Sequence, residues 1–108
     1  MTFRVVITRR AREDLRRYFL LAAEHAPGTA AKWLDRFETA LGSLAIHPEH
    51  FPLAPENNLV EDMIRQTFFG QRVGRFRVLF TLRDEDVIVL HIRRGTMNKA
   101  TAEDLDLP

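Results

Sequence analysis

The chain has 108 residues, of which 45% are hydrophobic and 29% charged, with a formal net charge of +1. This length suits one domain, and the composition excludes disordered and low-complexity proteins. The absence of cysteine excludes disulfide frameworks, thiolate metal sites and thiol nucleophiles, and it fits a reducing, cytoplasmic location. The longest apolar run, Tyr18 to Ala23, is far shorter than the roughly 20 residues that span a bilayer, so no contact with a membrane is expected.

The N-terminal half predicts a strand and two helices. Apolar side chains alternate over residues 3–7, which indicates a strand with one buried face. Thr8 then caps a helix that begins at Arg9 and ends at the breaker pair Pro27-Gly28. The apolar stripe of this helix consists of Ala11, Leu15, Tyr18, Phe19, Ala22 and Ala26.

Thr29 is predicted to cap a second helix, which ends before His47-Pro48. Its apolar residues recur every three or four positions, a spacing that favours packing on another helix or on a sheet. They are Ala30, Leu34, Phe37, Leu41 and Leu44, with Trp33 half-buried beside them. The two helices form a hairpin whose apolar faces need a sheet to cover them.

The C-terminal half predicts an irregular crossing and three strands. The prolines and asparagines of residues 47–63 indicate a loop with one helical turn near Leu59 to Met63. Strands are predicted over residues 64–69, 75–82 and 87–93, joined by turns over residues 70–74 and 83–86. The order β-α-α-β-β-β gives the α+β class, an antiparallel sheet with the helical hairpin on one face and the N-terminal strand at an edge. We expect one domain over residues 1–98 and a short acidic tail over residues 99–108.

The register of the last hairpin places like charges opposite each other. If Phe76, Val78, Phe80 and Leu82 share a face with Ile88, Leu90 and Ile92, a three-residue loop over residues 84–86 satisfies the pairing. Phe80 then faces Leu90 and Val78 faces Ile92, while Leu79 faces His91 and Arg77 faces Arg93 on the other side. Two opposed arginines repel, so this face either binds an anion, phosphate or a partner's carboxylates, or leaves both side chains in solvent.

The small net charge conceals strong local charges. Residues 65–99 contain eight basic residues against Asp84, Glu85 and Asp86, whereas residues 18–64 contain two basic residues and seven acidic ones. The positive block coincides with the strands that carry Arg77 and Arg93. Low net charge therefore does not exclude an acidic or phosphate-bearing partner.

Three other groups of residues favour ordinary structural roles. His47 and His50 have a metal-ligand spacing but lie around Pro48 and lack a third ligand, so solvated histidines are the better interpretation. The acidic run over residues 84–86 fits a hairpin tip better than a metal site. The arginines of the first helix are expected to form a solvated face rather than a nucleic-acid patch: Arg9, Arg10, Arg12, Arg16 and Arg17.

Several phrases in order resemble the RelE/ParE toxin superfamily of bacterial toxin–antitoxin systems, on its ParE or plasmid-stabilisation side. They are Phe3-Arg-Val-Val-Ile-Thr with Ala11 and Asp14-Leu15, the helix with Trp33, Phe37, Leu41 and Leu44 that ends at His47-Pro48, the phrase Gly74-Arg-Phe-Arg-Val-Leu-Phe-Thr-Leu, and Val87-Ile-Val-Leu-His-Ile-Arg-Arg-Gly. The superfamily fold is similar to the one predicted above. The resemblance covers nearly the whole chain.

The resemblance implies a growth-inhibiting toxin that is wrapped and blocked by the C-terminal segment of a cognate antitoxin of the ParD or RelB kind. ParE-like members poison DNA gyrase, and RelE-like members cleave mRNA on the ribosome. Arg77 matches an arginine of the ribonuclease members, and Arg65 roughly matches a basic position on the preceding strand. The match fails at Thr67, at Met97 and in the acidic tail, and the chain's single tyrosine lies in the first helix.

We therefore expect inhibition of gyrase by binding, with ribosome-dependent mRNA cleavage as the alternative and a non-toxic, antitoxin-binding member as a third possibility. The nuclease would use Arg77, His91 and Arg93 as anion clamp and acid or base, although no further residue completes the catalytic set. The residues expected to bind antitoxin or target are Arg65, Arg75, Arg77, His91, Arg93 and Arg94. No cofactor and no metal are expected.

Overall fold

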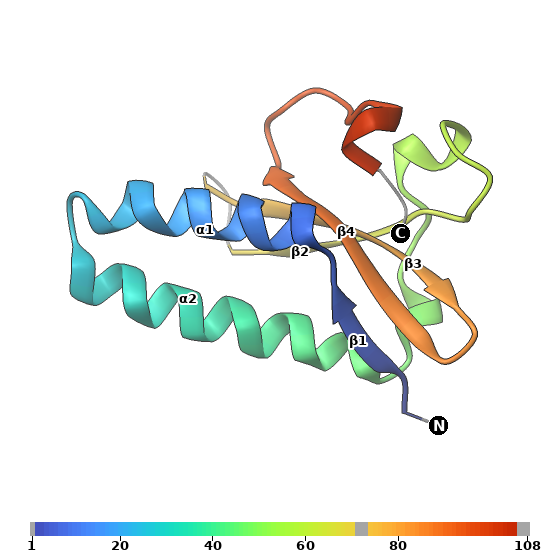
Figure 1. The fold of residues 1–108 in the computed structure, drawn as a ribbon, viewed down its shortest axis with the longest axis horizontal. Coiled ribbons are helices and arrows are strands. Elements are labelled where there is room, and N and C mark those ends of the chain that lie inside the picture. The colour runs from blue at the N-terminus through green and yellow to red at the C-terminus, as the bar shows by residue number, and fades with distance from the viewer. Residues whose placement is uncertain (1, 71–73, 106–108) are drawn as a thin grey trace.

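The computed structural model describes residues 2–70 and 74–105. Strand β1 (Arg4–Ile7) leads into a helical hairpin of α1 (Arg9–Ala23) and α2 (Pro27–Gly42). Strands β2 (Arg65–Phe69), β3 (Phe76–Arg83) and β4 (Asp86–Arg94) follow and form one sheet in the order β1-β4-β3-β2. β1 runs parallel to β4 at the edge of the sheet, and the other pairs are antiparallel. The α+β class, the element order and the edge position of β1 are confirmed (Figure 1).

The helices begin and end for local chemical reasons. The Oγ of Thr8 accepts a hydrogen bond from the N–H of Ala11, the N-cap that the sequence predicts. The Pro27-Gly28 pair was expected to separate the helices with Thr29 as the next cap, but Pro27 is the first residue of α2. Proline suits that position, because its fixed φ is helical and its missing N–H has no partner in a first turn.

The helices cover one face of the sheet and bury the larger of two apolar clusters. Phe37 is fully buried at its centre, and its ring lies 4.2 Å from that of Phe69 and 5.8 Å from that of Phe76. Trp33 is half-buried beside it, as predicted. The buried members of the cluster are Ala11, Leu15, Tyr18, Phe37, Leu41, Leu44, Phe76, Val78, Phe80, Val87, Val89 and Ile92.

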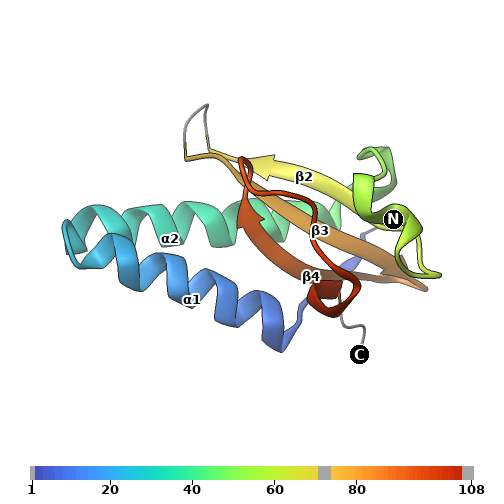
Figure 2. The ribbon, with the colours of Figure 1, turned by 90° about the horizontal axis from the view of Figure 1, so that it is seen from above.

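The opposite face of the sheet is covered as well, by the crossing from α2 to β2 and by the C-terminal segment (Figure 2). The crossing forms short 3-10 turns at Ser43–Ala45, Pro48–His50 and Pro55–Asn58, so the helical turn expected near Leu59 to Met63 lies earlier in the chain. A further 3-10 turn, Ala102–Leu105, packs the tail on the sheet. The second apolar cluster consists of Ala54, Ile64, Leu79, Ile88, Leu90, Ala100 and Leu105.

The turn expected over residues 70–74 lies partly outside the described residues. Within the described part of the chain, no helix has the length and apolarity needed to cross a bilayer.

We expect Phe37→Ala to lower the free energy of unfolding by about 3–5 kcal/mol, because it leaves a cavity among three aromatic rings. Leu21→Ala is the control: Leu21 is 49% exposed, so its truncation changes stability by no more than about 0.5 kcal/mol. Urea unfolding followed by circular dichroism measures both. Equal losses in the two variants would contradict this view of the core.

Candidate functional site

Four of the six residues predicted to bind or cleave lie on β3 and β4, so the register of this hairpin positions them: Arg77, His91, Arg93 and Arg94. Val78 pairs with Ile92, Leu79 with His91 and Arg77 with Arg93, as predicted. Beyond them Phe80 pairs with Val89 and not with Leu90, because a β-bulge shifts the register between Leu79 and Phe80.

The bulge corrects both the loop and the faces of β4. Arg83 pairs with Asp86, so two residues and not three form the loop, with Asp84 at φ 54° in the left-handed conformation that such tight turns require. The extra residue is taken up by the bulge, where one strand bends and its side chains change faces. Ile88 and Leu90, which were predicted to face the helices, therefore pack in the second cluster on the opposite face of the sheet. Val87 and Val89 face the helices instead.

Arg77 is buried in an ion pair with Glu56 of the crossing. Its Nη1 donates to Glu56 Oε1 at 3.0 Å and to Gln66 Oε1 at 2.9 Å, and its Nη2 donates to Glu56 Oε2. The side chain of Glu56 is fully buried, and its Oε2 also accepts the N–H of Ala100 at 2.8 Å. Burial alone would raise the pKa of the Glu56 carboxyl, but the hydrogen bonds from Arg77 and Ala100 outweigh it and lower that pKa to about 2.

His91 is buried against Asp14 of α1. The His91 Nδ1 and Asp14 Oδ2 atoms lie 2.6 Å apart, and the same oxygen accepts the N–H of Ile92 at 3.0 Å. Burial raises the pKa of Asp14, but the hydrogen bonds from His91 and Ile92 exceed that effect and leave the pKa below its ordinary value. Asp14 thus joins α1 to β4. Its contacts with His91 and Ile92 lie beyond Val89, the last residue of β4 that pairs with β1.

Arg93 lies under the C-terminal segment. Its Nη1 lies 3.3 Å from Asp104 Oδ2 and 3.4 Å from His91 Nε2, while its buried Nε has no hydrogen-bond partner among the described residues. Asp104 also accepts from Nη2 of Arg10 at 2.8 Å and from the N–H of Thr101 at 2.9 Å. The acidic tail therefore neutralises two arginines of its own chain.

These contacts correct the expectation that Arg77, His91 and Arg93 form an open face. The structure does bring the three together on neighbouring strands, but each is at most 7% exposed and has an internal carboxylate nearby. The arginines neither extend into solvent nor leave room for an external anion. A direct role in binding or cleavage requires the tail and the crossing to move away.

The other three predicted binding residues differ in accessibility. Arg65 is half-buried and donates to the carbonyl of Phe51 at 2.7 Å. Arg75 and Arg94 are exposed. The guanidinium of Arg75 lies 4.0 Å from the ring centre of Phe68, and that of Arg94 lies 5.4 Å from the ring centre of Phe76, as in cation–π pairs.

Arg94 borders an aromatic hollow of about 260 Å³ between the helices and the sheet. Its lining residues are Tyr18, Ala22, Ala26, Thr29, Ala30, Trp33, Phe76 and Arg94. Aromatic side chains next to arginine are the composition that protein interfaces favour.

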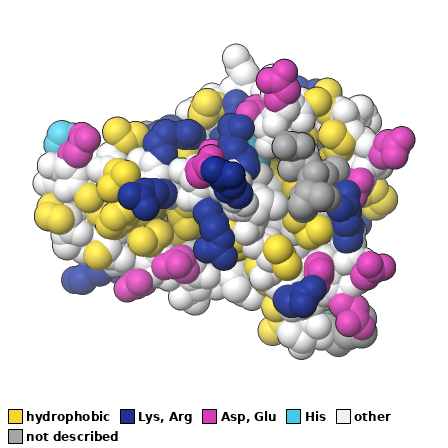
Figure 3. Space-filling view, in the orientation of Figure 1, with side chains coloured by type: hydrophobic (Ala, Val, Ile, Leu, Met, Phe, Trp, Pro, Cys, Tyr) yellow, Lys and Arg dark blue, Asp and Glu magenta, His cyan; other side chains and the backbone are white. Residues whose placement is uncertain are grey.

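A larger groove of about 410 Å³ runs between α1 and α2. Its lining residues are Arg12, Leu15, Arg16, Phe19, Leu20, Leu34 and Glu38. Leu20 and Leu21 are nearly half exposed, and Figure 3 shows hydrophobic side chains gathered over the helical hairpin with basic side chains around them.

The basic face of α1 is partly neutralised. Arg9 pairs with Glu13, and Arg10 pairs with Asp14 and Asp104. Arg12 and Arg16 form no ion pair with any other described residue, so they keep their charge available beside the groove. At the β3–β4 tip, Asp86 pairs with Arg4 at 2.9 Å, which agrees with a turn rather than a metal site.

Sequence reasoning missed the three internal carboxylates. One signal was available for Asp14, because it falls on the buried stripe of α1 between Ala11 and Leu15, where a carboxylate needs a partner. Glu56 lies in a crossing without periodicity, so its position gives no such signal. For Asp104 the signal was the negative charge of the tail, which complements the positive strands.

Comparisons with known proteins bear on the fold of the chain. A family described as "ParE toxin of type II toxin-antitoxin system, parDE" matches residues 5–99. A solved structure titled "Chromosomal ParDE TA system from P. aeruginosa" superposes with a TM-score of 0.69 at 19% identity, covering 86% of this chain and 96% of that chain. At that identity the structure shows a shared fold. No curated protein sequence matches significantly.

The buried carboxylate gives a testable pH dependence. Because the pKa of Glu56 is lower in the folded chain than its ordinary 4.5, the stability it contributes is complete above about pH 4.5 and is lost as the pH falls toward 2. The shift corresponds to about 3 kcal/mol. Glu56→Gln leaves Arg77 buried without a countercharge, and we expect a loss of about 3 kcal/mol at pH 7 and a flatter pH profile below 4.5.

Urea unfolding at several pH values tests this expectation, with the exposed residue Glu61 changed to Gln as the matched control. Glu61→Gln should follow the parent chain at every pH. If Glu56→Gln also followed it, the buried pair would not contribute to stability.

Proposed function

Because the chain belongs to the ParE toxin family of type II toxin–antitoxin systems, we propose that it inhibits DNA gyrase by binding it and that a cognate antitoxin neutralises it. The observation that carries this proposal is the burial of Arg77, His91 and Arg93 against Glu56, Asp14 and Asp104. RNA cleavage needs an accessible base, an acid and an anion clamp. Side chains already held by internal carboxylates supply none of these, whereas inhibition by binding needs only a surface.

We assign target binding to the end of the sheet where Arg75 and Arg94 are exposed on aromatic rings. Among the six predicted binding residues, these two are the exposed ones. Arginine held on an aromatic ring is partly desolvated and preoriented, which lowers the entropy cost of binding. The adjacent hollow offers Tyr18, Trp33 and Phe76 as apolar surface.

The groove between α1 and α2 is our proposed antitoxin site. Its floor is apolar, and its charged lining residues are Arg12, Arg16 and Glu38, which leave the rim with a net positive charge. An amphipathic segment with apolar residues on one side and Asp or Glu on the other complements both features. We place this segment on the helical hairpin rather than on the arginine face of the sheet, because Arg77 and Arg93 already pair with internal carboxylates.

The target proposal predicts that the purified chain inhibits DNA supercoiling by gyrase. Arg94→Glu should weaken inhibition about tenfold or more, because it reverses a charge at the contact surface. Arg94→Lys keeps the charge but loses the planar guanidinium on the ring, so its inhibition should lie between that of Arg94→Glu and that of the parent chain. A supercoiling assay with increasing protein measures this, and thermal melting confirms that both variants are folded. Supercoiling that is untouched by excess parent chain would overturn the proposal, and new mRNA ends in primer extension on translated mRNA would favour the ribonuclease alternative.

The antitoxin proposal predicts a separate effect at the groove. Arg16→Glu should weaken binding of the antitoxin, tested as the product of an adjoining reading frame, about tenfold or more. Arg36→Glu is the matched control, because Arg36 is exposed on α2 and does not line the groove. Fluorescence anisotropy with a labelled antitoxin measures the affinity. If Arg36→Glu weakened binding as much as Arg16→Glu, only net charge would matter and the groove would not be the site.

A further inference from the structure

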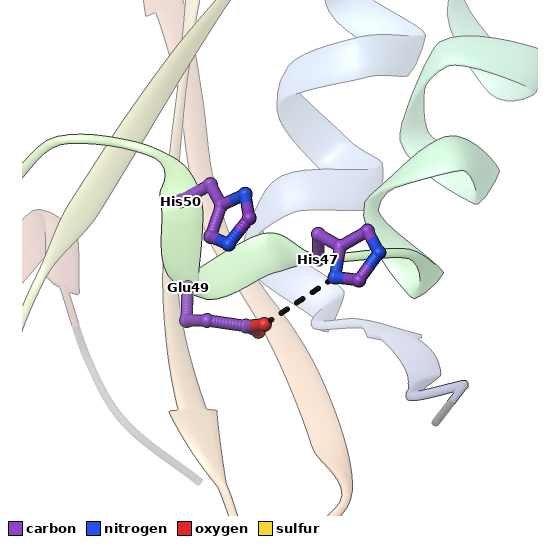
Figure 4. A group of neighbouring side chains, drawn as sticks. All are labelled: His47, Glu49 and His50. Carbon is purple, nitrogen blue, oxygen red and sulfur yellow. Dashed lines mark ion pairs between the residues drawn. The ribbon is translucent and has the colours of Figure 1, made fainter.

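Three potential metal ligands converge in the turn after α2. His47, Glu49 and His50 are exposed, and each offers one ligand atom such that these atoms all lie within 4.8 Å of one another. Figure 4 shows the carboxylate of Glu49 reaching toward the ring of His47, with the ring of His50 beside them at the Pro48–His50 turn. The sequence argument set the two histidines aside because a third ligand was missing. Glu49 provides it.

The backbone places these side chains together. His47 has φ 51° and ψ 46°, a left-handed conformation that few residues other than glycine adopt. Pro48 is buried and fixes the turn, and the N–H of His50 donates to the carbonyl of His47 at 3.1 Å. The two imidazole rings consequently stack nearly parallel, with an angle of 9° between their planes and their centres 5.1 Å apart. The carboxylate of Glu49 lies 3.7 Å from Nδ1 of His47.

The donor set selects a class of metal. Two imidazole nitrogens and one carboxylate oxygen suit Zn²⁺ and its neighbours in the first transition series, whereas Mg²⁺ and Ca²⁺ prefer sites made of oxygen alone. Bonds of about 2.0–2.1 Å in a tetrahedron place ligand atoms roughly 3.4 Å apart. The present separations of up to 4.8 Å therefore need to close by roughly 1.4 Å, which exposed side chains achieve by small rotations.

We propose that His47, Glu49 and His50 form a surface site for a divalent transition metal, with Zn²⁺ as the best-fitting ion and water in the fourth position. The site is independent of the proposed gyrase and antitoxin surfaces. Metal bound there would hold the start of the crossing rigid, next to the point where Ile46 pairs with Thr2 beside β1.

Isothermal titration of the full-length chain, prepared without a polyhistidine tag, with ZnCl₂ tests the proposal. We expect one equivalent of Zn²⁺ to bind saturably. The substitutions His47→Ala, Glu49→Gln and His50→Ala should each lower the affinity for Zn²⁺ at least about tenfold. Loss of a hydrogen-bond partner outside the ligand shell already costs roughly that much, and loss of a ligand should cost no less. His25→Ala removes the one other exposed histidine among the described residues, since His91 is buried, and should leave the affinity unchanged.

Titration with Co²⁺ adds a readout of geometry, because tetrahedral Co²⁺ absorbs visible light far more strongly than the hydrated ion. The parent chain and His25→Ala should develop this absorption, and the three ligand variants should not. The proposal is overturned if one equivalent does not bind, if the three substitutions leave the affinity unchanged, or if His25→Ala lowers it as much as they do. Because gyrase inhibition is not measured here, failure of one proposal is distinguishable from failure of the other.

Discussion

The ion pair between Arg77 and Glu56 connects three parts of the chain that lie far apart in the sequence. Arg77 belongs to the centre of the sheet, Glu56 to the crossing from α2 to β2, and the N–H of Ala100, which also binds Glu56, to the C-terminal segment. A buried guanidinium without a countercharge costs several kcal/mol. The chain can therefore bury this face of the sheet only when the crossing and the tail are both in place.

The same requirement explains how the sheet face is closed. Each of the other two polar side chains also has a carboxylate partner: Asp14 contacts His91, and Asp104 contacts Arg93. A row of polar side chains therefore lies beside the second apolar cluster. The β-bulge contributes to the same packing. It leaves Leu90 without a partner residue on β3, and it turns Ile88 and Leu90 toward Leu79 and away from the helices. Apolar packing and ion pairs thus secure the same layer of irregular chain.

Sequence patterns were sufficient where one local interaction decides the structure. The Thr8 cap, the periodicity of Phe37 and Leu41, and the pairing of Arg77 with Arg93 follow from short-range chemistry and from the parity of a strand. The bulge could not be predicted, because a two-residue loop with a bulge and a three-residue loop without one satisfy the same pairing near Arg77. The partners of Arg77 and Arg93 could not be predicted either. Glu56 and Asp104 lie in segments without periodicity, and only the tertiary fold brings them to the sheet.

Closure of the sheet face also determines which charges remain available to partners. Two arginines in the middle of the positive strand segment, Arg77 and Arg93, are neutralised by carboxylates of the crossing and the tail, so their charge is not a surface property. Exposed cations remain at two other places, as Arg12 and Arg16 on the helical groove and as Arg75 and Arg94 on aromatic rings at one end of the strands. A partner with acidic groups is thus attracted to these two places rather than to the middle of the strands. Since electrostatic attraction at an exposed surface is screened beyond about 10 Å, each place acts locally, and a net charge near zero is compatible with two separate surfaces of the kind proposed above for target and antitoxin.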